Sequence, residues 1–234
     1  ADKTSFLPPT LTNGNVHGII VLNVYNERLL RLLAETQIPK VFLDTSSLVA
    51  PDELNGDLLL MESRTSVRRI TSHLLEQGRT LPGFIGDIGY AQSNRERYEG
   101  FCQALTDAGK KVDSSLCLTT PLGIDTYREE IDTFLSSLSR MPDAFVCASD
   151  YVACILMQLL EKRGLRVPED VAVSGFDNNT EDLLAEHLTT VQVFNEELGA
   201  RLALQILYRI KYPNTPHEIT YLGTNVLYRD STGD

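Results

Sequence analysis

Cysteine is scarce in this chain, and its four copies are not spaced as a ligand set or a disulfide framework. Cys102, Cys117, Cys147 and Cys154 form no CxxC pair, and no Cys/His set has the spacing of a zinc site. Buried free thiols of this kind are typical of proteins kept in the reducing cytosol. We therefore expect a cytoplasmic protein that holds no metal.

Long apolar runs are absent as well. No segment approaches the stretch of about eighteen apolar residues that marks a transmembrane helix. The first residues, ADKTSFLPPTLTNG, lack the charged-then-apolar pattern of a secretory signal. We expect no membrane partner. Apolar residues nevertheless make up 42% of the 234 residues, which is ample for the core of one large domain or two small ones.

Basic residues are outnumbered by acidic ones. Lys and Arg total 21 against 32 Asp and Glu, which gives a formal net charge of −11. A surface that binds the phosphate backbone of nucleic acid needs clustered Lys and Arg. This segment is therefore not expected to bind nucleic acid by itself. The charge balance says nothing about a DNA-binding module outside these residues.

The common catalytic motifs are also missing. No GxSxG elbow, P-loop or HExxH occurs, and the glycines of GFIGDIG do not match GxGxxG. The four histidines, at positions 17, 73, 187 and 217, show no spacing that suggests a triad or a metal site. We expect a protein that is not an enzyme and that needs no cofactor.

The most informative stretch that is present covers residues 142–191. Residues 144–148 are a short apolar run typical of a buried strand, and Ser149-Asp150 is a natural helix start. Apolar residues then recur at helical spacing up to Gly164, and Pro168 blocks any continuation. Residues 170–176 form a second strand. The pattern predicts a βαβ unit with parallel strands, whose carboxyl ends carry Ser149, Asp150 and Asp177.

Strands and helices alternate through the rest of the chain, which favours an α/β fold with parallel sheets. Further strands are predicted at residues 16–22, 40–43, 57–61, 81–85, 115–118, 189–193, 217–221 and 226–228. Further helices are predicted at residues 26–37, 65–77, 93–108, 125–140, 180–186 and 196–210. Pro82 donates no ladder hydrogen bond, so it should occupy the first position of its strand.

The segments CASDYVA, GLRVPEDVAVSGFDN and LTTV, together with SNRERYEGF, resemble signatures of the lac/gal repressor (LacI/GalR) family of bacterial transcription regulators. The likeness runs from VHGIIVLN to VLYRDST, which is nearly the whole chain. It implies the effector-binding domain, with the two-lobed type I periplasmic-binding-protein-like fold. In that fold, parallel sheets flanked by helices form two lobes, joined by three hinge crossings, with the effector between them.

The resemblance also divides the chain. It implies an N-terminal lobe of residues 1–88 and 194–213, and a C-terminal lobe of residues 89–193 and 214–234. It places the crossings near residues 87–90, 193–194 and 212–216. Family members carry roughly fifty to sixty more residues before the equivalent of Ala1, so the N-terminal lobe is expected to lack its first strands here. The DNA-reading helix-turn-helix is expected upstream and outside this chain.

Three candidate ligand-binding residues belong to the C-terminal lobe. Arg97 matches the family's R-x-x-G-F element, whose guanidinium reaches ligand hydroxyls. The alternative is a solvated arginine in a charged helix turn. Asp177 matches an aspartate that accepts hydrogen bonds from sugar hydroxyls; it is also a candidate helix cap. Ser149 stands where relatives have asparagine, so this contact is expected to be lost, rotated or water-mediated.

Five candidates belong to the N-terminal lobe and its borders. Asn23 and Asp44 end two successive strands, and turn capping is the alternative role for each. Tyr25, Tyr90 and Phe194 are aromatic residues placed to stack on a sugar face.

The resemblance implies a domain that senses a small carbohydrate-like ligand and that passes lobe closure to an upstream DNA-binding module. It also implies a homodimer that contacts through helices near residues 65–77 and 154–163 and binds operator DNA. An extracytoplasmic sugar- or solute-binding protein of a transporter is the alternative. A regulator of a phosphorylated sugar or purine is a third reading, which the single cleft cation Arg97 and the acidic balance disfavour.

Overall fold

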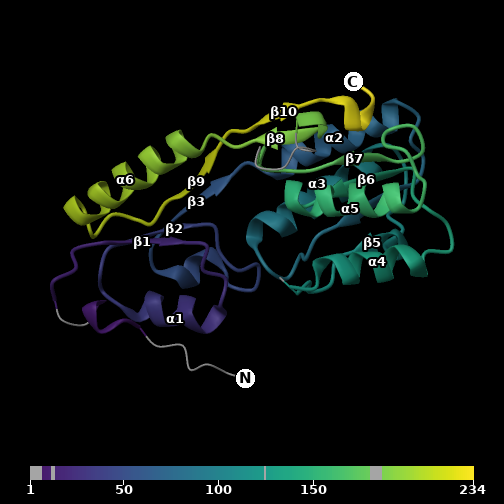
Figure 1. The fold of residues 1–234 in the computed structure, drawn as a ribbon. Helices are drawn as coiled ribbons and strands as arrows, with labels where there is room; N and C mark the ends of the chain where they lie inside the picture. The colour runs from purple at the N-terminus through teal and green to yellow at the C-terminus, as the bar shows by residue number, and fades with distance from the viewer. Residues whose placement is uncertain (1–6, 12–13, 124, 180–185) are drawn as a thin grey trace. The chain divides into compact units, whose positions relative to one another are not determined.

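The computed structural model describes residues 7–11, 14–123, 125–179 and 186–234 of the chain. These residues form two compact units, each built on its own parallel sheet (Figure 1). Unit 1 comprises the described parts of Ala1–Met61, together with Tyr90–Ser93 and Phe194–Gly223. Unit 2 comprises Glu62–Gly89, the described parts of Asn94–Val193, and Thr224–Asp234.

The sheet of unit 1 has the strand order β1-β2-β3-β9, with every pairing parallel. Its elements are β1 (Ile19–Leu22), α1 (Glu27–Glu35), β2 (Lys40–Leu43), β3 (Asp57–Met61), α6 (Asn195–Lys211) and β9 (Ile219–Leu222), with short 3-10 helices at Pro9–Leu11 and Pro51–Leu54. Helices α1 and α6 lie on opposite faces of this sheet (Figure 1). Parallel strands covered on both faces read as short apolar runs, as they do here. In register, Val21 pairs with Phe42 and Phe42 with Leu58, so these three side chains meet in the core with Leu30 of α1.

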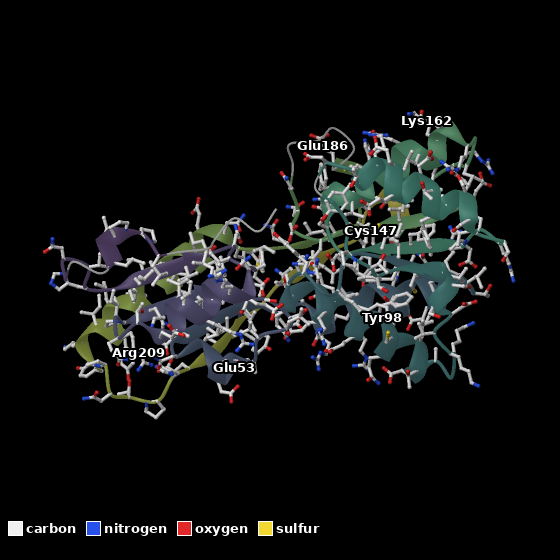
Figure 2. All side chains as sticks on the ribbon, turned by 90° about the horizontal axis from the view of Figure 1, so that it is seen from below. Glu53, Tyr98, Cys147, Lys162, Glu186 and Arg209 are labelled. Atoms are coloured by element: carbon white, nitrogen blue, oxygen red, sulfur yellow. The ribbon has the colours of Figure 1, made fainter. Side chains whose placement is uncertain are left out.

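The sheet of unit 2 has the strand order β5-β4-β6-β7 and is also parallel. Its elements are α2 (Arg64–Glu76), β4 (Pro82–Ile85), α3 (Gln92–Asp107), β5 (Cys117–Leu118), α4 (Tyr127–Ser137), β6 (Ala144–Cys147), α5 (Asp150–Lys162) and β7 (Ala172–Ser174), with 3-10 helices at Ser114–Leu116 and Asp230–Thr232. Strands β8 (Thr190–Gln192) and β10 (Asn225–Leu227) form a separate antiparallel pair. Pro82 is the first residue of β4, as expected. Cys147 lies among the buried side chains of this unit (Figure 2).

The predicted βαβ unit is confirmed as β6, α5 and β7. Ser149 is the N-cap of α5, and its Oγ accepts a hydrogen bond from the Val152 N–H at 3.3 Å. At the other end Gly164 has a φ of +72°, the left-handed conformation that ends helices. The apolar face of α5 packs with Phe145 and Val173 in the core of unit 2. The caps and the apolar spacing therefore determine both the limits and the orientation of this helix.

The division into units differs from the predicted lobes in two places. Residues 62–88 were assigned to the N-terminal lobe, but Glu62–Gly89 belongs to unit 2, because β4 pairs with β5 and β6 and α2 contacts β6 and β10. Residues 214–223 belong to unit 1 rather than the C-terminal lobe, because β9 completes the unit 1 sheet beside β3.

The chain passes between units at positions 61–62, 193–194 and 223–224, and Tyr90–Ser93 is a short return to unit 1. Passages at 89–90 and 193–194 fall within the predicted crossings near residues 87–90 and 193–194. The last passage lies at 223–224 rather than near residues 212–216, and the passage at 61–62 was not predicted. The helix predicted at residues 180–186 falls on residues 180–185, which lie outside the described part of the chain.

Candidate functional site

Polar residues follow the strands of both sheets at their carboxyl ends, and the backbone there is unusual. Asn23 comes directly after β1 and Asp44 directly after β2, with φ values of +53° and +59°. In unit 2, Asp177 and Asn178 follow β7 with φ values of +110° and +53°. Residues other than glycine rarely adopt this region, and such strain is often found at ligand sites. The carboxyl ends of the strands are therefore the place to look for function.

Unit 1 brings four of its five predicted residues together. The Tyr25 hydroxyl lies 3.4 Å from Asn23 Oδ1 and 3.5 Å from Asp44 Oδ2. The Tyr25 and Tyr90 rings are in contact, with centroids 4.4 Å apart and planes tilted by 44°. Phe194 precedes α6 with a partly exposed ring, and within the described chain it makes no ring contact with these tyrosines.

Asp44 is occupied by its own surroundings. The carboxylate is buried and accepts hydrogen bonds from the Thr45 N–H at 2.8 Å and from the Ser93 hydroxyl at 2.6 Å. The Ser93 N–H also donates to this carboxylate, at a longer distance of 3.3 Å. These bonds support the turn-capping alternative, in which Asp44 fastens the Tyr90–Ser93 segment to the end of β2. Asn23 is exposed, and its Oδ1 accepts a long hydrogen bond of 3.4 Å from the Tyr25 hydroxyl.

Arg97 is a buried polar side chain of unit 2. It is only 4% exposed, so the alternative of a solvated arginine is wrong. Its guanidinium carbon lies 3.6 Å from the centroid of the Phe176 ring, and Nη1 donates to the Ala148 carbonyl oxygen. Nη2 donates to Asp177 Oδ1 at 3.4 Å, and Nε has no hydrogen-bond partner among the described residues.

Asp177 has the exposure that a ligand acceptor needs. Its side chain is 43% exposed, and the single long bond from Arg97 leaves most of its acceptor capacity unused. Its backbone N–H donates to the Val191 carbonyl oxygen at 3.1 Å, which ties the residue to β8. Arg97 and Asp177 thus present a fixed donor next to a fixed acceptor, an arrangement that can bind two neighbouring hydroxyl groups.

Of the predicted helix start Ser149-Asp150, Ser149 is the residue that caps α5. Ser149 caps α5 as described above, so its oxygen is already an acceptor for the helix. Asp150 is the first residue of α5. It is 2% exposed and accepts from the Thr190 hydroxyl at 2.6 Å and the Asn179 N–H at 2.8 Å. Burial raises the pKa of Asp150 to about 6, and these two hydrogen bonds offset burial only in part.

A supporting network next to Asp177 was missed by sequence reasoning. Arg229 Nη2 donates to Asn178 Oδ1 at 2.9 Å, and Asn178 Nδ2 donates to Gln192 Oε1 at 2.5 Å. Arg229 Nη1 also donates to the Leu188 carbonyl oxygen at 3.0 Å. The partners come from three separate segments, and the only sequence hint was that Arg229 lies in the family-like VLYRDST segment. The network holds Asn178, and therefore Asp177, in its unusual conformation.

The described residues offer neither a metal-binding cluster nor a membrane-spanning helix. In the described part of the chain, no group of three or more His, Cys, Asp and Glu side chains is placed to hold a metal ion. Among the same residues, no helix combines the length and apolar character needed to cross a bilayer.

A family model described as a periplasmic binding protein-like domain matches residues 71–232, well over half of the chain. The chain belongs to this family. Among relatives of this periplasmic binding protein-like domain is the HTH-type transcriptional repressor PurR of Glaesserella parasuis serovar 5, which is 27% identical over 216 residues. The match covers 92% of this chain and 62% of that repressor. The domain thus spans less than two thirds of its curated relative's length.

Solved structures of transcriptional regulators also match this chain. The transcriptional regulator CelR in complex with cellobiose matches with a TM-score of 0.84 and 27% identity, covering 95% of this chain and 68% of that one. A LacI-family transcriptional regulator from Sanguibacter keddieii matches with a TM-score of 0.72 and 27% identity, covering 86% and 75%. These matches confirm the α/β periplasmic-binding-protein-like fold and the resemblance to LacI-type regulators. The relatives are named as regulators rather than as enzymes.

Proposed function

We propose that this chain is the effector-binding domain of a bacterial LacI-type transcription regulator, and that its effector is a small polyhydroxylated molecule such as a sugar. The observation that carries the proposal is the buried Arg97, stacked on Phe176 and bonded to the exposed Asp177. A planar guanidinium beside a carboxylate matches the alternating donors and acceptors of vicinal hydroxyls. The cellobiose complex of CelR supports a carbohydrate as the ligand class.

The rest of the regulator belongs to the same proposal. Operator DNA is bound by a helix-turn-helix encoded upstream, the domain forms a homodimer in the cytoplasm, and the effector shifts the protein between states because it binds one of them better. Relatives named as repressors and regulators favour this proposal over a transporter's solute-binding protein. Sequencing the gene upstream of the Ala1 codon separates the two: a helix-turn-helix supports the regulator, whereas a secretory signal supports the transporter protein.

Ligand binding is tested by a thermal-shift screen against mono- and disaccharides, sugar phosphates and nucleobases, followed by titration calorimetry of the hits. Asp177→Asn keeps the shape of the side chain but removes its charge, and we expect affinity to fall by about ten- to a hundredfold. Asp170→Asn is the matched control, because Asp170 also pairs with an arginine, Arg166, but on the surface of unit 2. Equal affinity in the Asp177→Asn variant and the parent protein would contradict the proposed site.

The other predicted residues remain proposals that the same titration tests singly. We expect Tyr90→Ala and Phe194→Ala to weaken binding, because removing an aromatic face removes a stacking surface. For Asn23→Ala, Tyr25→Phe and Ser149→Ala the expected loss is smaller, since each removes one hydrogen-bonding group.

A further inference from the structure

A small cavity lies at the amino-terminal edge of the unit 1 sheet, opposite to the carboxyl ends of the strands. Its volume is about 90 Å³, and its lining includes Thr36, Lys40, Asn55, Arg209, Pro213 and His217. Lys40 begins β2, and His217 lies two residues before β9. A water molecule occupies about 30 Å³ in the liquid, so the cavity holds a few waters or one small ion.

Lys40 brings a buried positive charge to this cavity. Its side chain is 2% exposed, and Nζ donates to the carbonyl oxygens of Thr36 at 2.9 Å and Asn55 at 3.1 Å. An ammonium group has three N–H donors, so one remains without a partner within the described structure. The stem is fixed by packing, because a Cβ on Gly56 would lie only 2.5 Å from Lys40 Cγ. Burial of the stem and the two carbonyl bonds together hold the ammonium group at the cavity.

The second buried cation, Arg209, is already neutralised. Arg209 lies near the end of α6 (Figure 2) and bonds Asp57 through Nη2 at 2.5 Å and Nε at 3.0 Å. Gln205 and the Glu218 N–H also donate to Asp57. Burial would raise the pKa of Asp57, but these hydrogen bonds outweigh it and lower the pKa. Asp57 is thus ionised, and both of its carboxylate oxygens accept hydrogen bonds from Arg209, Gln205 or the Glu218 N–H.

The charge of Lys40 is consequently not balanced. In the described part of the chain, no carboxylate lies within ion-pair distance of Nζ, and the carboxylate of Glu218 faces Arg201 and Gln205 instead. A buried charge without a counterion is strongly unfavourable. The exposed His217 lines the same cavity and makes no side-chain hydrogen bond to another described residue, so its imidazole adds a further donor at the mouth.

We propose that this cavity binds a small tetrahedral oxyanion, such as inorganic phosphate or sulfate, held by the Lys40 ammonium group and the His217 imidazole. The anion takes the free N–H of Lys40 and neutralises its charge. The site lies within unit 1 and at the other edge of its sheet from Asn23 and Asp44, so it is separate from the proposed effector site. The volume of about 90 Å³ matches a free ion, whereas a nucleotide or a sugar would have to extend beyond the cavity.

The titration behaviour of the two groups agrees with this geometry. Burial lowers the pKa of Lys40 to about 8. Burial also lowers the pKa of His217, and the charges of Arg209 and Lys40 add to the effect while Asp57 opposes it. A bound oxyanion stabilises both protonated forms. Binding near pH 8 is therefore expected to take up about half a proton, because Lys40 is half deprotonated there before binding.

The test is equilibrium dialysis of the chain against labelled inorganic phosphate, with chloride added to keep the ionic strength constant. We expect saturable binding of one ion, competed by sulfate. Lys40→Met, which keeps the length of the side chain, should weaken binding at least about tenfold. Lys162→Met removes an exposed lysine from unit 2 and should leave binding unchanged.

A second variant keeps the test valid even if Lys40→Met does not fold. The exposed His217→Ala is expected to fold normally and to weaken phosphate binding, and calorimetry of the parent chain in two buffers at pH 8 should show the proton uptake. Equal binding by Lys40→Met and the parent chain, or no saturable binding in the millimolar range, would overturn the proposal. Phosphate also stabilises folded proteins in general, as a salt excluded from their surface. That effect would be equal in the parent chain and in all variants.

Discussion

Single residues in this domain owe their properties to burial more than to their chemical type. Arginine and lysine are usually exposed, yet Arg97, Arg209 and Lys40 are among the buried side chains. Each is held by carbonyl oxygens, a carboxylate or an aromatic ring, and each has lost the freedom of a surface side chain. Fixed charges of this kind suit binding, because little conformational entropy is lost when a ligand arrives.

Lys40 should make the stability of the domain depend on alkaline pH. Its pKa is about 8 in the folded chain against an ordinary 10.5, so between these values the unfolded chain binds a proton that the folded chain does not. The free energy of unfolding therefore rises with pH over this window, by about 3 kcal/mol in total. Urea unfolding between pH 7.5 and 10 should show this rise in the parent chain and in Lys162→Met, and not in Lys40→Met. Parallel curves for all three would show that Lys40 has an ordinary pKa.

Asp150 should act in the opposite direction at acidic pH. Its folded pKa of about 6 lies above the ordinary 3.8, so the folded chain holds the extra proton between these values. The free energy of unfolding contributed by this group falls as pH rises from about 4 to about 6, by roughly 3 kcal/mol. The difference in unfolding free energy between the parent and Asp150→Asn, followed over this range, measures it. A constant difference would contradict the assignment.

Secondary-structure elements were predictable where local signals determine them. The βαβ unit of β6, α5 and β7 was found from an apolar run, a Ser N-cap and a C-terminal glycine, which all act within a few residues. The partners of an element were not predictable in the same way. The amphipathic face of α2 does not say which sheet it covers, and β9 pairs with β3 across more than 150 residues.

The candidate site was predictable to a similar degree. Arg97 and Asp177 were found because a family-like motif carries each of them, and the structure places them in contact. Which of Ser149 and Asp150 caps the helix was not predictable, because adjacent polar residues at a helix start are equally plausible caps from sequence alone. Arg229 was missed because it acts on a residue 51 positions away.

Close packing of α2 against α3 depends on a glycine in the middle of α3. A Cβ on Gly100 would lie 2.2 Å from the Arg64 carbonyl oxygen, so Gly100→Ala must push backbone apart and should cost about 1–3 kcal/mol. Gly199 in α6 is a matched control, because nothing lies within 4 Å of its added Cβ. Gly199→Ala should instead stabilise the chain by about 0.5–1 kcal/mol. Urea unfolding of both variants gives the comparison, and a Gly100→Ala chain as stable as the parent would refute the packing argument.

At the scale of the whole molecule, the acidic surface charge determines which partners these 234 residues can bind alone. The net charge of −11 opposes contact with phosphates. We expect no anisotropy change when the chain is mixed with a labelled duplex of about thirty base pairs at low salt. Binding that weakens steeply with salt would show that this domain contacts DNA directly.

The division into units has a consequence for how the protein is made. Neither unit is a continuous stretch: the sheet of unit 1 needs β9, and unit 2 needs the last residues, where the Ser231 and Thr232 hydroxyls bond Val173 and Thr189. During translation, therefore, neither unit can finish folding while residues 219–234 are still inside the ribosome. The sheet of unit 1 waits with β3 as an open edge until β9 emerges, and β8 of unit 2 waits for its partner β10. A chaperone that covers those edges would have to stay bound until residues 219–227 have left the ribosome.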